Sequence, residues 1–240
     1  LTPRTTGNMI WSDFIHTVTR PVDGVPDPDL HAHCVAFNAT YDLKEQRWKA
    51  AEFHSLKQDA PYYEAAFHSR LAARIRALGF GIERNGKWWD IAGIPRDLIE
   101  KFSRRTAMIE AKADELGITN ANAKGELGAR TREQKALHLD QATLKAAWQG
   151  RLSAKDRTAL DMVLSTGTSE NSGGQTGITP EDALAYAITA SFERVSVVSE
   201  KQLYETALRR GVGGVSPEEI AAAAERAGIL TATIDGRKLV

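Results

Sequence analysis

Apolar and polar residues alternate along two stretches near the start of the chain. Residues 8–19 and 30–41 mix β-branched and aromatic side chains with polar ones, and residues 20–29 between them are rich in proline, aspartate and glycine. Alternation of this kind predicts strands, and the turn-forming residues predict a loop. We therefore expect two antiparallel neighbouring strands, followed by a turn and a short strand over residues 41–48.

The spacing of apolar residues becomes helical further along the chain. A long helix is predicted over residues 56–78, with a stop at Gly79. Asn85-Gly86 suits a tight turn with positive φ, so a hairpin is expected over residues 80–91. Helical spacing continues through the middle of the chain, over residues 95–102, 103–116 and 131–164.

The last third of the chain predicts a second, smaller module. Residues 165–179 read STGTSENSGGQTGIT, a polar, glycine-rich segment typical of a linker. We therefore divide the chain into residues 1–164, a linker at 165–179 and a module at 180–240. Three helices and a terminal hairpin make this module winged-helix-like, over residues 180–192, 200–210, 217–227, 229–234 and 238–240.

Composition excludes several classes of protein. Lysine plus arginine equals aspartate plus glutamate at 31 each, so the chain as a whole has no nucleic-acid signature and any such surface must be local. The single cysteine, Cys34, excludes an internal disulfide framework. No apolar run is long enough to span a membrane and no signal-peptide pattern is present, so we expect a cytoplasmic protein without membrane insertion.

Three histidines are the strongest candidates for chemistry. His31 and His33 lie two apart in a predicted strand and therefore share one face of the sheet. His16, in the preceding strand, can reach the same face if the two strands pair. Such a site can hold a divalent ion that orients a phosphodiester for attack. An isolated His-x-His is more often an ordinary strand, so spacing alone leaves this hypothesis weak.

A series of further residues strengthens it. In chain order they are Thr6-Gly-Asn8, Phe14-Ile-His16, Asp27-Pro-Asp-Leu-His-Ala-His33, Phe37-Asn38, Arg47-Trp48, Tyr62-Tyr-Glu-Ala65, Leu78-Gly-Phe80 and Phe102-Ser-Arg-Arg-Thr106. Together they resemble the TrwC/TraI-type (MOB-F) conjugative relaxases of the HUH endonuclease superfamily. The region around Phe192-Glu-Arg194 and Ser199-Glu-Lys-Gln-Leu203 more loosely resembles the start of the helicase part of these proteins.

This resemblance implies a fold, a metal site and a reaction. The implied fold class is α+β: part of the relaxase antiparallel sheet with helices, followed by the winged-helix-like module. His16, His31 and His33 would bind a divalent ion (Mg, Mn or Zn). The implied partners are single-stranded DNA at a plasmid transfer origin and relaxosome accessory proteins. The family nicks this DNA with a tyrosine near its N-terminus, which becomes attached to the 5′ phosphate.

No tyrosine of this chain matches that nucleophile, because all five lie downstream of the histidines: Tyr41, Tyr62, Tyr63, Tyr186 and Tyr204. The family's Ser-Ala-Pro-Lys-Ser strand is also absent. We therefore expect a relaxase fragment that is inactive alone and whose sheet exposes an edge and apolar faces. No Gly-x-x-x-x-Gly-Lys-Ser/Thr phosphate loop occurs, so no ATP site is expected.

Several other residues could contact DNA or contribute to packing. Lys101, Arg104 and Arg105 form a basic cluster that could bind phosphates, with a solvated helix face as an equally good interpretation. Trp88 and Trp89 could stack on bases, although the two lie on alternate faces of a predicted strand and at least one of them is expected in the core. The remaining aromatic, cysteine and histidine residues are assigned to packing (Trp11, Trp48, Cys34) or excluded as metal ligands (His54, His68, His138).

Two alternatives to the relaxase fragment stay open at this point. One is a non-catalytic remnant that binds DNA or a relaxosome partner through its helices and winged tail. The other is an unrelated three-histidine metalloenzyme that uses a metal-bound water as nucleophile.

Overall fold

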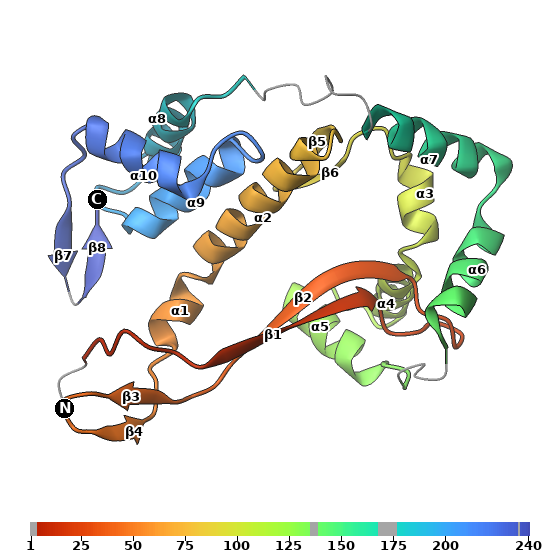
Figure 1. The fold of residues 1–240 in the computed structure, drawn as a ribbon, viewed down its shortest axis with the longest axis horizontal. Coiled ribbons are helices and arrows are strands. Elements are labelled where there is room, and N and C mark those ends of the chain that lie inside the picture. The colour runs from red at the N-terminus through yellow and green to blue at the C-terminus, as the bar shows by residue number, and fades with distance from the viewer. Residues whose placement is uncertain (1–3, 135–138, 168–176, 235) are drawn as a thin grey trace. The chain divides into compact units, whose positions relative to one another are not determined.

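The chain has an α+β fold in which antiparallel strand pairs are combined with helices (Figure 1). The computed structural model describes residues 4–134, 139–167, 177–234 and 236–240. Its elements are β1 (Trp11–Val18), β2 (Pro28–Ala36), β3 (Thr40–Asp42), β4 (Arg47–Lys49), α1 (His54–Gln58), α2 (Ala60–Ala77), β5 (Ile82–Asn85), β6 (Trp88–Ile91), α3 (Arg96–Lys101), α4 (Arg104–Glu115), α5 (Ala121–Arg130), α6 (Gln141–Arg151), α7 (Ala154–Gly167), α8 (Pro180–Ser191), α9 (Glu200–Arg210), α10 (Pro217–Arg226), β7 (Ala232–Ile234) and β8 (Arg237–Leu239). None of the described helices is long and apolar enough to cross a lipid bilayer.

These elements gather into two compact units, each built from two separate segments of the chain. The first unit consists of Leu1–Ala51 and Ile94–Ala159, and the second of Glu52–Gly93 and Leu160–Val240. Much of the predicted linker, residues 168–176, lies outside the described residues. The predicted domain limits therefore stay a prediction.

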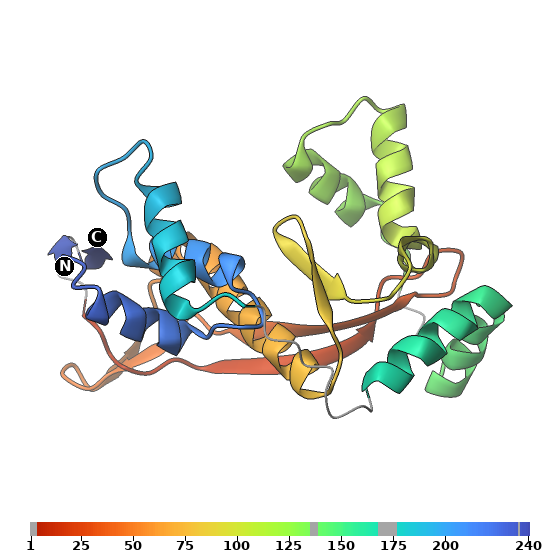
Figure 2. The same ribbon diagram turned by 90° about the horizontal axis from the view of Figure 1, so that it is seen from above.

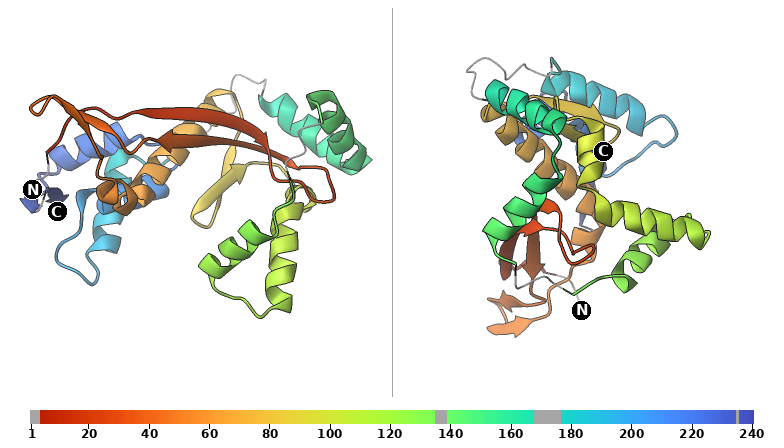
Figure 3. Two further views of the ribbon diagram at one scale, coloured as in Figure 1. Left: turned by 90° about the horizontal axis from the view of Figure 1, so that it is seen from below. Right: turned by 90° about the vertical axis from the view of Figure 1, so that its right-hand side faces the viewer.

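The first unit contains the expected antiparallel pair β1–β2, a long twisted ribbon (Figure 3). The pairing places Phe14 opposite His33 and His16 opposite His31. The other strands also pair in twos, as β3–β4, β5–β6 and β7–β8. Within the described residues, the sheet expected from the resemblance is thus present as separate two-stranded pairs.

Large apolar side chains are exposed on this ribbon. On the face opposite the histidines, Trp11, Ile15 and Leu30 are 55%, 63% and 77% exposed. Trp11 and Cys34, which were predicted to pack, are exposed in the structure, and Trp48 is also exposed although its ring contacts Tyr41. A two-stranded ribbon with uncovered apolar faces and free edges has marginal stability in water. The exposed edge and faces therefore agree with the expectation for an incomplete relaxase sheet.

The helix α5 of the first unit was not predicted from the sequence. Its segment contains Gly125 and Gly128, which lower helix propensity. The helix nevertheless begins at a good cap, because the Asn120 side-chain oxygen accepts hydrogen bonds from the backbone N–H groups of Asn122 and Ala123. An asparagine N-cap was the signal that could have predicted it.

The helical stretch predicted over residues 131–164 is also different in the structure. It contains α6 and α7, which are separated at Leu152 and Ser153, and residues 135–138 lie outside the described residues. The Ser153 hydroxyl accepts from the N–H of Asp156 (3.2 Å), and the Asp156 carboxylate accepts from the N–H of Ser153 (2.8 Å). This reciprocal cap starts a new helix, so the predicted stretch divides.

The single helix predicted over residues 56–78 is divided in the same way. Pro61 lies in the first turn of α2, and a proline restricts the residue before it and has no N–H to donate. The helix is therefore interrupted at Asp59, where α1 has ended and α2 has not yet begun. Helix α2 ends before Gly79, as predicted. The β5–β6 hairpin is confirmed, with Asn85 opposite Trp88 and the positive φ of 61° at Gly86.

The described tail of the chain has the winged-helix-like order that the sequence predicted. Helices α8, α9 and α10 lie together in the second unit, and the β7–β8 hairpin follows them (Figure 2). Val198, between α8 and α9, exchanges two backbone hydrogen bonds with Val240 at 2.9 and 3.1 Å. The hairpin is thereby joined to an extended segment that precedes α9.

The hydrophobic core of this tail includes α2. Leu203, Leu208 and Ile220 are fully buried, and they belong to the same cluster as Ala65 and Ala66 of α2. Hydrogen bonds from α2 to the turn between α9 and α10 reinforce the contact, from the Ser69 hydroxyl to the Val215 carbonyl and from Arg76 Nη1 to the Gly213 carbonyl (2.6 Å). The tail and α2 therefore form one packed structure.

A buried ion pair in the first unit predicts a pH dependence of its stability. Asp156 is 4% exposed and accepts a hydrogen bond from Lys101 Nζ. Lys101, together with the N–H and hydroxyl of Ser153, lowers the pKa of Asp156 from 3.8 to about 2. Because the folded pKa lies below the unfolded value, the ionised carboxylate stabilises the fold above about pH 4, and this contribution is lost as the pH falls toward 2.

We expect Asp156→Asn to reduce the free energy of unfolding at about pH 6 and to change it much less at about pH 2. Urea unfolding of the parent and the variant at both pH values measures this difference. A difference that is equal at both pH values would contradict the pKa assignment.

Candidate metal centre

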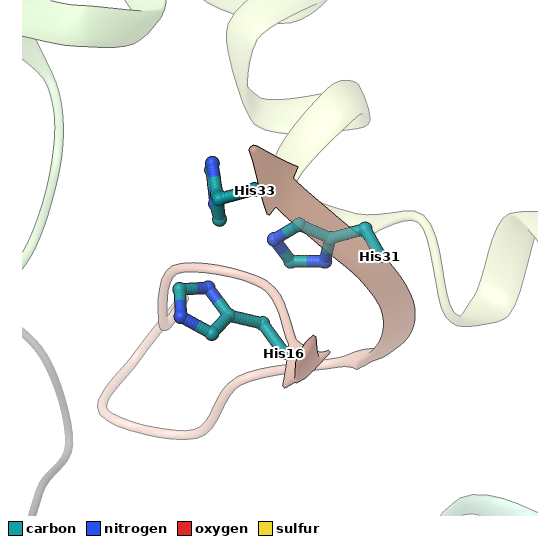
Figure 4. A group of neighbouring side chains, drawn as sticks. All are labelled: His16, His31 and His33. Atoms are coloured by element: carbon teal, nitrogen blue, oxygen red, sulfur yellow. The ribbon is translucent and has the colours of Figure 1, made fainter. Parts of the chain in front are cut away.

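Three histidines converge on one face of the β1–β2 ribbon. His31 and His33 project from β2, and His16 projects from β1 directly opposite His31 (Figure 4). The ring centroids lie 5.3 Å apart for His16 and His31, 4.6 Å for His16 and His33, and 5.0 Å for His31 and His33. One nitrogen of each ring lies within 4.8 Å of the others. The predicted ligands are thus brought together.

The donor set fits a divalent transition-metal ion. Imidazole nitrogens bind Zn²⁺ at about 2.0–2.1 Å, so the rings would have to close only slightly around an ion placed between them. His16 and His31 are half-buried and His33 is exposed. Three nitrogen ligands on an accessible face leave further coordination positions for a substrate oxygen, and imidazoles accept several divalent metals.

A neighbouring residue orients one of these ligands. His31 Nδ1 donates to the backbone carbonyl of Asp29 at 3.0 Å, and the Asp29 carboxylate lies 3.3 Å from the same nitrogen. A proton held at Nδ1 leaves the Nε2 lone pair of His31 free for a metal. Asp29 was not predicted to have a role, although its position two residues before His31 is evident in the sequence.

The basic residues predicted to contact DNA have partners inside the first unit. Lys101 binds Asp156, and Arg104 binds Asp27 through Nε at 3.0 Å. Arg105 Nη1 donates to the Thr131 carbonyl at 2.9 Å. These contacts support a structural role for each side chain, and a role in DNA binding stays a prediction.

Trp88, the fourth residue predicted to contact DNA, lies on β6 in the second unit. Its ring is 37% exposed, and Lys87 Nζ and Arg209 Cζ lie 4.7 and 5.7 Å from the ring centroid. His68 packs against it at a centroid distance of 5.0 Å, and burial lowers the pKa of His68. Base stacking by this partly exposed indole stays a prediction.

The tyrosines are divided between the two units. Tyr41, in the first unit, donates its hydroxyl to Gln46 Oε1 (3.4 Å) and packs on Trp48. Tyr62, Tyr63, Tyr186 and Tyr204 belong to the second unit. Burial, with the nearby Glu200 carboxylate, raises the pKa of Tyr204 to about 12.

Of the histidines excluded as ligands, His54 starts α1, His68 packs on Trp88, and His138 lies outside the described residues.

The fold and this site define a class: α+β proteins that present a three-histidine cluster on an antiparallel ribbon. The chain belongs to the TrwC relaxase family, whose model matches residues 2–155. The interpretation as an unrelated metalloenzyme is therefore wrong. No curated protein matches the sequence.

Solved structures of conjugative relaxase TrwC are similar to this chain. A metal-free complex with OriT DNA is 28% identical, with a TM-score of 0.56, over 65% of this chain and 54% of that chain. A metal-bound complex with OriT DNA is 27% identical, with a TM-score of 0.55, over 62% of this chain and 51% of that chain. The chain thus spans about half the length of these structures.

Proposed function

We propose that this chain supplies the metal-binding part of a conjugative DNA relaxase, which nicks one DNA strand at a plasmid transfer origin. The observation that carries the proposal is the convergence of His16, His31 and His33 on one face of the ribbon. Family membership and the likeness to TrwC structures that contain OriT DNA, some of them metal-bound, support it. Relaxosome accessory proteins are further proposed partners.

Of the expected ions Mg, Mn and Zn, the three histidines would suit Mn or Zn best, and the bound ion would supply Lewis-acid polarisation of a phosphoryl oxygen. His31 is oriented for this by the Asp29 carbonyl. The strand is cleaved by a tyrosine: its hydroxyl gives up a proton as its oxygen bonds to phosphorus, the bond from phosphorus to the 3′ oxygen breaks, and the 3′ oxygen takes up a proton to become a 3′ hydroxyl. The 5′ phosphate stays attached to the tyrosine.

We assign this tyrosine to a polypeptide segment outside the sequence described here, so the chain alone does not nick. Two features of the molecule support the assignment. Tyr41 is engaged with Gln46 and Trp48 rather than grouped with the histidines. The β1–β2 ribbon also has free edges and exposed apolar faces that an added strand would cover.

The winged-helix-like tail contributes little to DNA binding in this proposal. The exposed residues of α10 include Glu218, Glu219 and Glu225, which would repel phosphates. Base stacking is assigned to Trp88 instead. These charges argue against DNA binding by the winged tail in the alternative of a non-catalytic remnant, which would bind DNA or a relaxosome partner through its helices and winged tail.

A single experiment with two measurements tests the proposal. The chain is mixed with Mn²⁺, the tyrosine-bearing N-terminal segment of a TrwC relaxase and the single-stranded OriT oligonucleotide of that relaxase. Fluorescence anisotropy measures binding, and a denaturing gel detects a covalent protein–DNA adduct. We expect an adduct only when all components are present.

Two variants separate binding from chemistry. His31→Ala is expected to remove the adduct with little change in binding, and Trp88→Ala to weaken binding by roughly one to two orders of magnitude, the usual contribution of one stacked base. Trp48→Ala, which also removes an exposed tryptophan, is the matched control. If the segment forms an adduct with the remaining half of its own relaxase but not with this chain, the proposed function is wrong.

A further inference from the structure

A buried carboxylate lies just before the strand that carries His31 and His33. Asp27 is 1% exposed and binds two arginines from different helices. Its Oδ1 accepts from Arg104 Nε (3.0 Å) and Arg151 Nη1 (2.7 Å), and its Oδ2 accepts from the backbone N–H of Arg104 (3.0 Å). The guanidinium of Arg151 also lies 4.3 Å from the Phe102 ring centroid. Asp27 is therefore fixed to α4 and α6.

Asp27 also closes the loop between the two strands. Its backbone N–H donates to the Thr19 hydroxyl at 3.0 Å, and its carbonyl accepts from the N–H of Thr19 at 2.9 Å. Next to this pair, Val18 lies opposite Pro28. The ion pairs of Asp27 thus fix the pairing of β1 and β2 at the loop end of the ribbon.

The pairing of Val18 with Pro28 is not in register with the rest of the β1–β2 ribbon. Between the pairs Val18–Pro28 and His16–His31, β2 is one residue longer than β1, which makes a β-bulge around Asp29 and Leu30. In a regular strand, backbone carbonyls point sideways to the neighbouring strand, whereas a bulge disrupts this pattern locally. The Asp29 carbonyl accepts from His31 Nδ1 at this irregular position.

We infer that Asp27 is a positioning residue for the metal site, because its buried ion pairs hold the bulge that turns the Asp29 carbonyl toward His31. The bulge thereby selects the His31 tautomer with the proton on Nδ1 and the lone pair on Nε2. The role of this tautomer in metal binding rests on the proposed function. The tautomer itself is expected in the metal-free chain as well. Arg104, predicted to contact DNA, acts here through Asp27.

The test measures the tautomer of His31 in the metal-free chain by ¹⁵N NMR of the imidazole nitrogens, at a pH where the ring is neutral. The parent is expected to carry the proton on Nδ1. Asp27→Ala and deletion of Leu30 are expected to move the proton substantially to Nε2. Both changes are expected to lower Zn²⁺ affinity roughly 10–100-fold, as loss of a group that orients a metal ligand does.

The deletion of Leu30 keeps the inference testable if Asp27→Ala fails to fold. It removes a side chain that is 77% exposed, and it lets Val18–Pro28 and His16–His31 both pair without a bulge. Asp156→Ala, which breaks another buried ion pair of the same unit, is the matched control and should leave the tautomer unchanged.

The inference is wrong if the parent carries the proton on Nε2, if deleting Leu30 leaves the tautomer unchanged, or if Asp156→Ala shifts it equally. A parent with the expected tautomer that binds no Zn²⁺ would instead contradict the proposed function and leave the positioning role of Asp27 standing.

Discussion

Replacing His31 or His33 with alanine is expected to lower the affinity of the chain for Zn²⁺ or Mn²⁺ by at least about 100-fold, because loss of a ligand costs no less than loss of a group that orients one. Each substitution removes one of three nitrogens that lie within 4.8 Å of one another. Because both rings stand on a partly exposed ribbon face, the fold should not change. Calorimetric titration measures the affinity, and circular dichroism checks the fold.

His54→Ala is the matched control for these variants. His54 is also a histidine of the described chain, but it lies at the start of α1 in the second unit and does not belong to the three-histidine cluster. We expect this variant to bind metal like the parent. If His54→Ala weakens binding as much as His31→Ala, the ion is bound elsewhere or without a defined site, and the ligand assignment is wrong.

Gly213→Ala is expected to destabilise the second unit by about 3 kcal/mol, through overlap in a packed core and a left-handed backbone conformation. Gly213 has a φ of +73°, and an added Cβ would lie 2.5 Å from Ile82 Cδ1 and 3.2 Å from the Ala72 Cβ. The turn between α9 and α10 approaches α2 and β5 at this point. Urea unfolding followed by circular dichroism measures the loss.

Gly228→Ala separates the two causes of this effect. Gly228 lies in the same unit with a φ of +64°, but nothing lies within 4 Å of an added Cβ. Its substitution should cost only the backbone term, about 1 kcal/mol. Equal losses for the two variants would show that the close approach of the tail to α2 does not stabilise the unit.

The sequence was sufficient to predict which three histidines lie together in the structure. Alternation over residues 8–19 and 30–41 predicted two strands, and spacing placed His31 and His33 on one face. The resemblance to relaxases then favoured a shared site with His16, and the structure confirms that the three rings converge. Local periodicity and motif order carry this information, so no tertiary contact was needed to find it.

The elements that support the site were harder to predict. The bulge near Asp29 follows from the binding of Asp27 to Arg104 and Arg151, which are 77 and 124 residues away in the sequence. Contacts at such distances leave no periodic pattern in the sequence. For the same reason, the sequence suggested a DNA surface near Lys101, although Lys101 and Arg104 bind buried aspartates and Arg105 binds backbone carbonyls in the structure.

The exposure of Trp11 shows a different limit of prediction from the sequence. An aromatic residue in an alternating strand normally packs against a second layer, so a buried position was the reasonable prediction. Whether a strand face is covered depends on the rest of the sheet, and in the described residues the β1–β2 ribbon has no further strand. Covering this face is the role we propose for the segment that carries the tyrosine.

The most direct test of the metal site is a titration of the ¹⁵N-labelled chain with Zn²⁺, observed through the imidazole nitrogens of its six histidines. The three-histidine site predicts that one equivalent of Zn²⁺ shifts the signals of His16, His31 and His33 together. The signals of the other three histidines should change little. No shift in a folded chain, or shifts centred on His54 or His68, would contradict the site and with it the assignment of this chain as the metal-binding part of a relaxase.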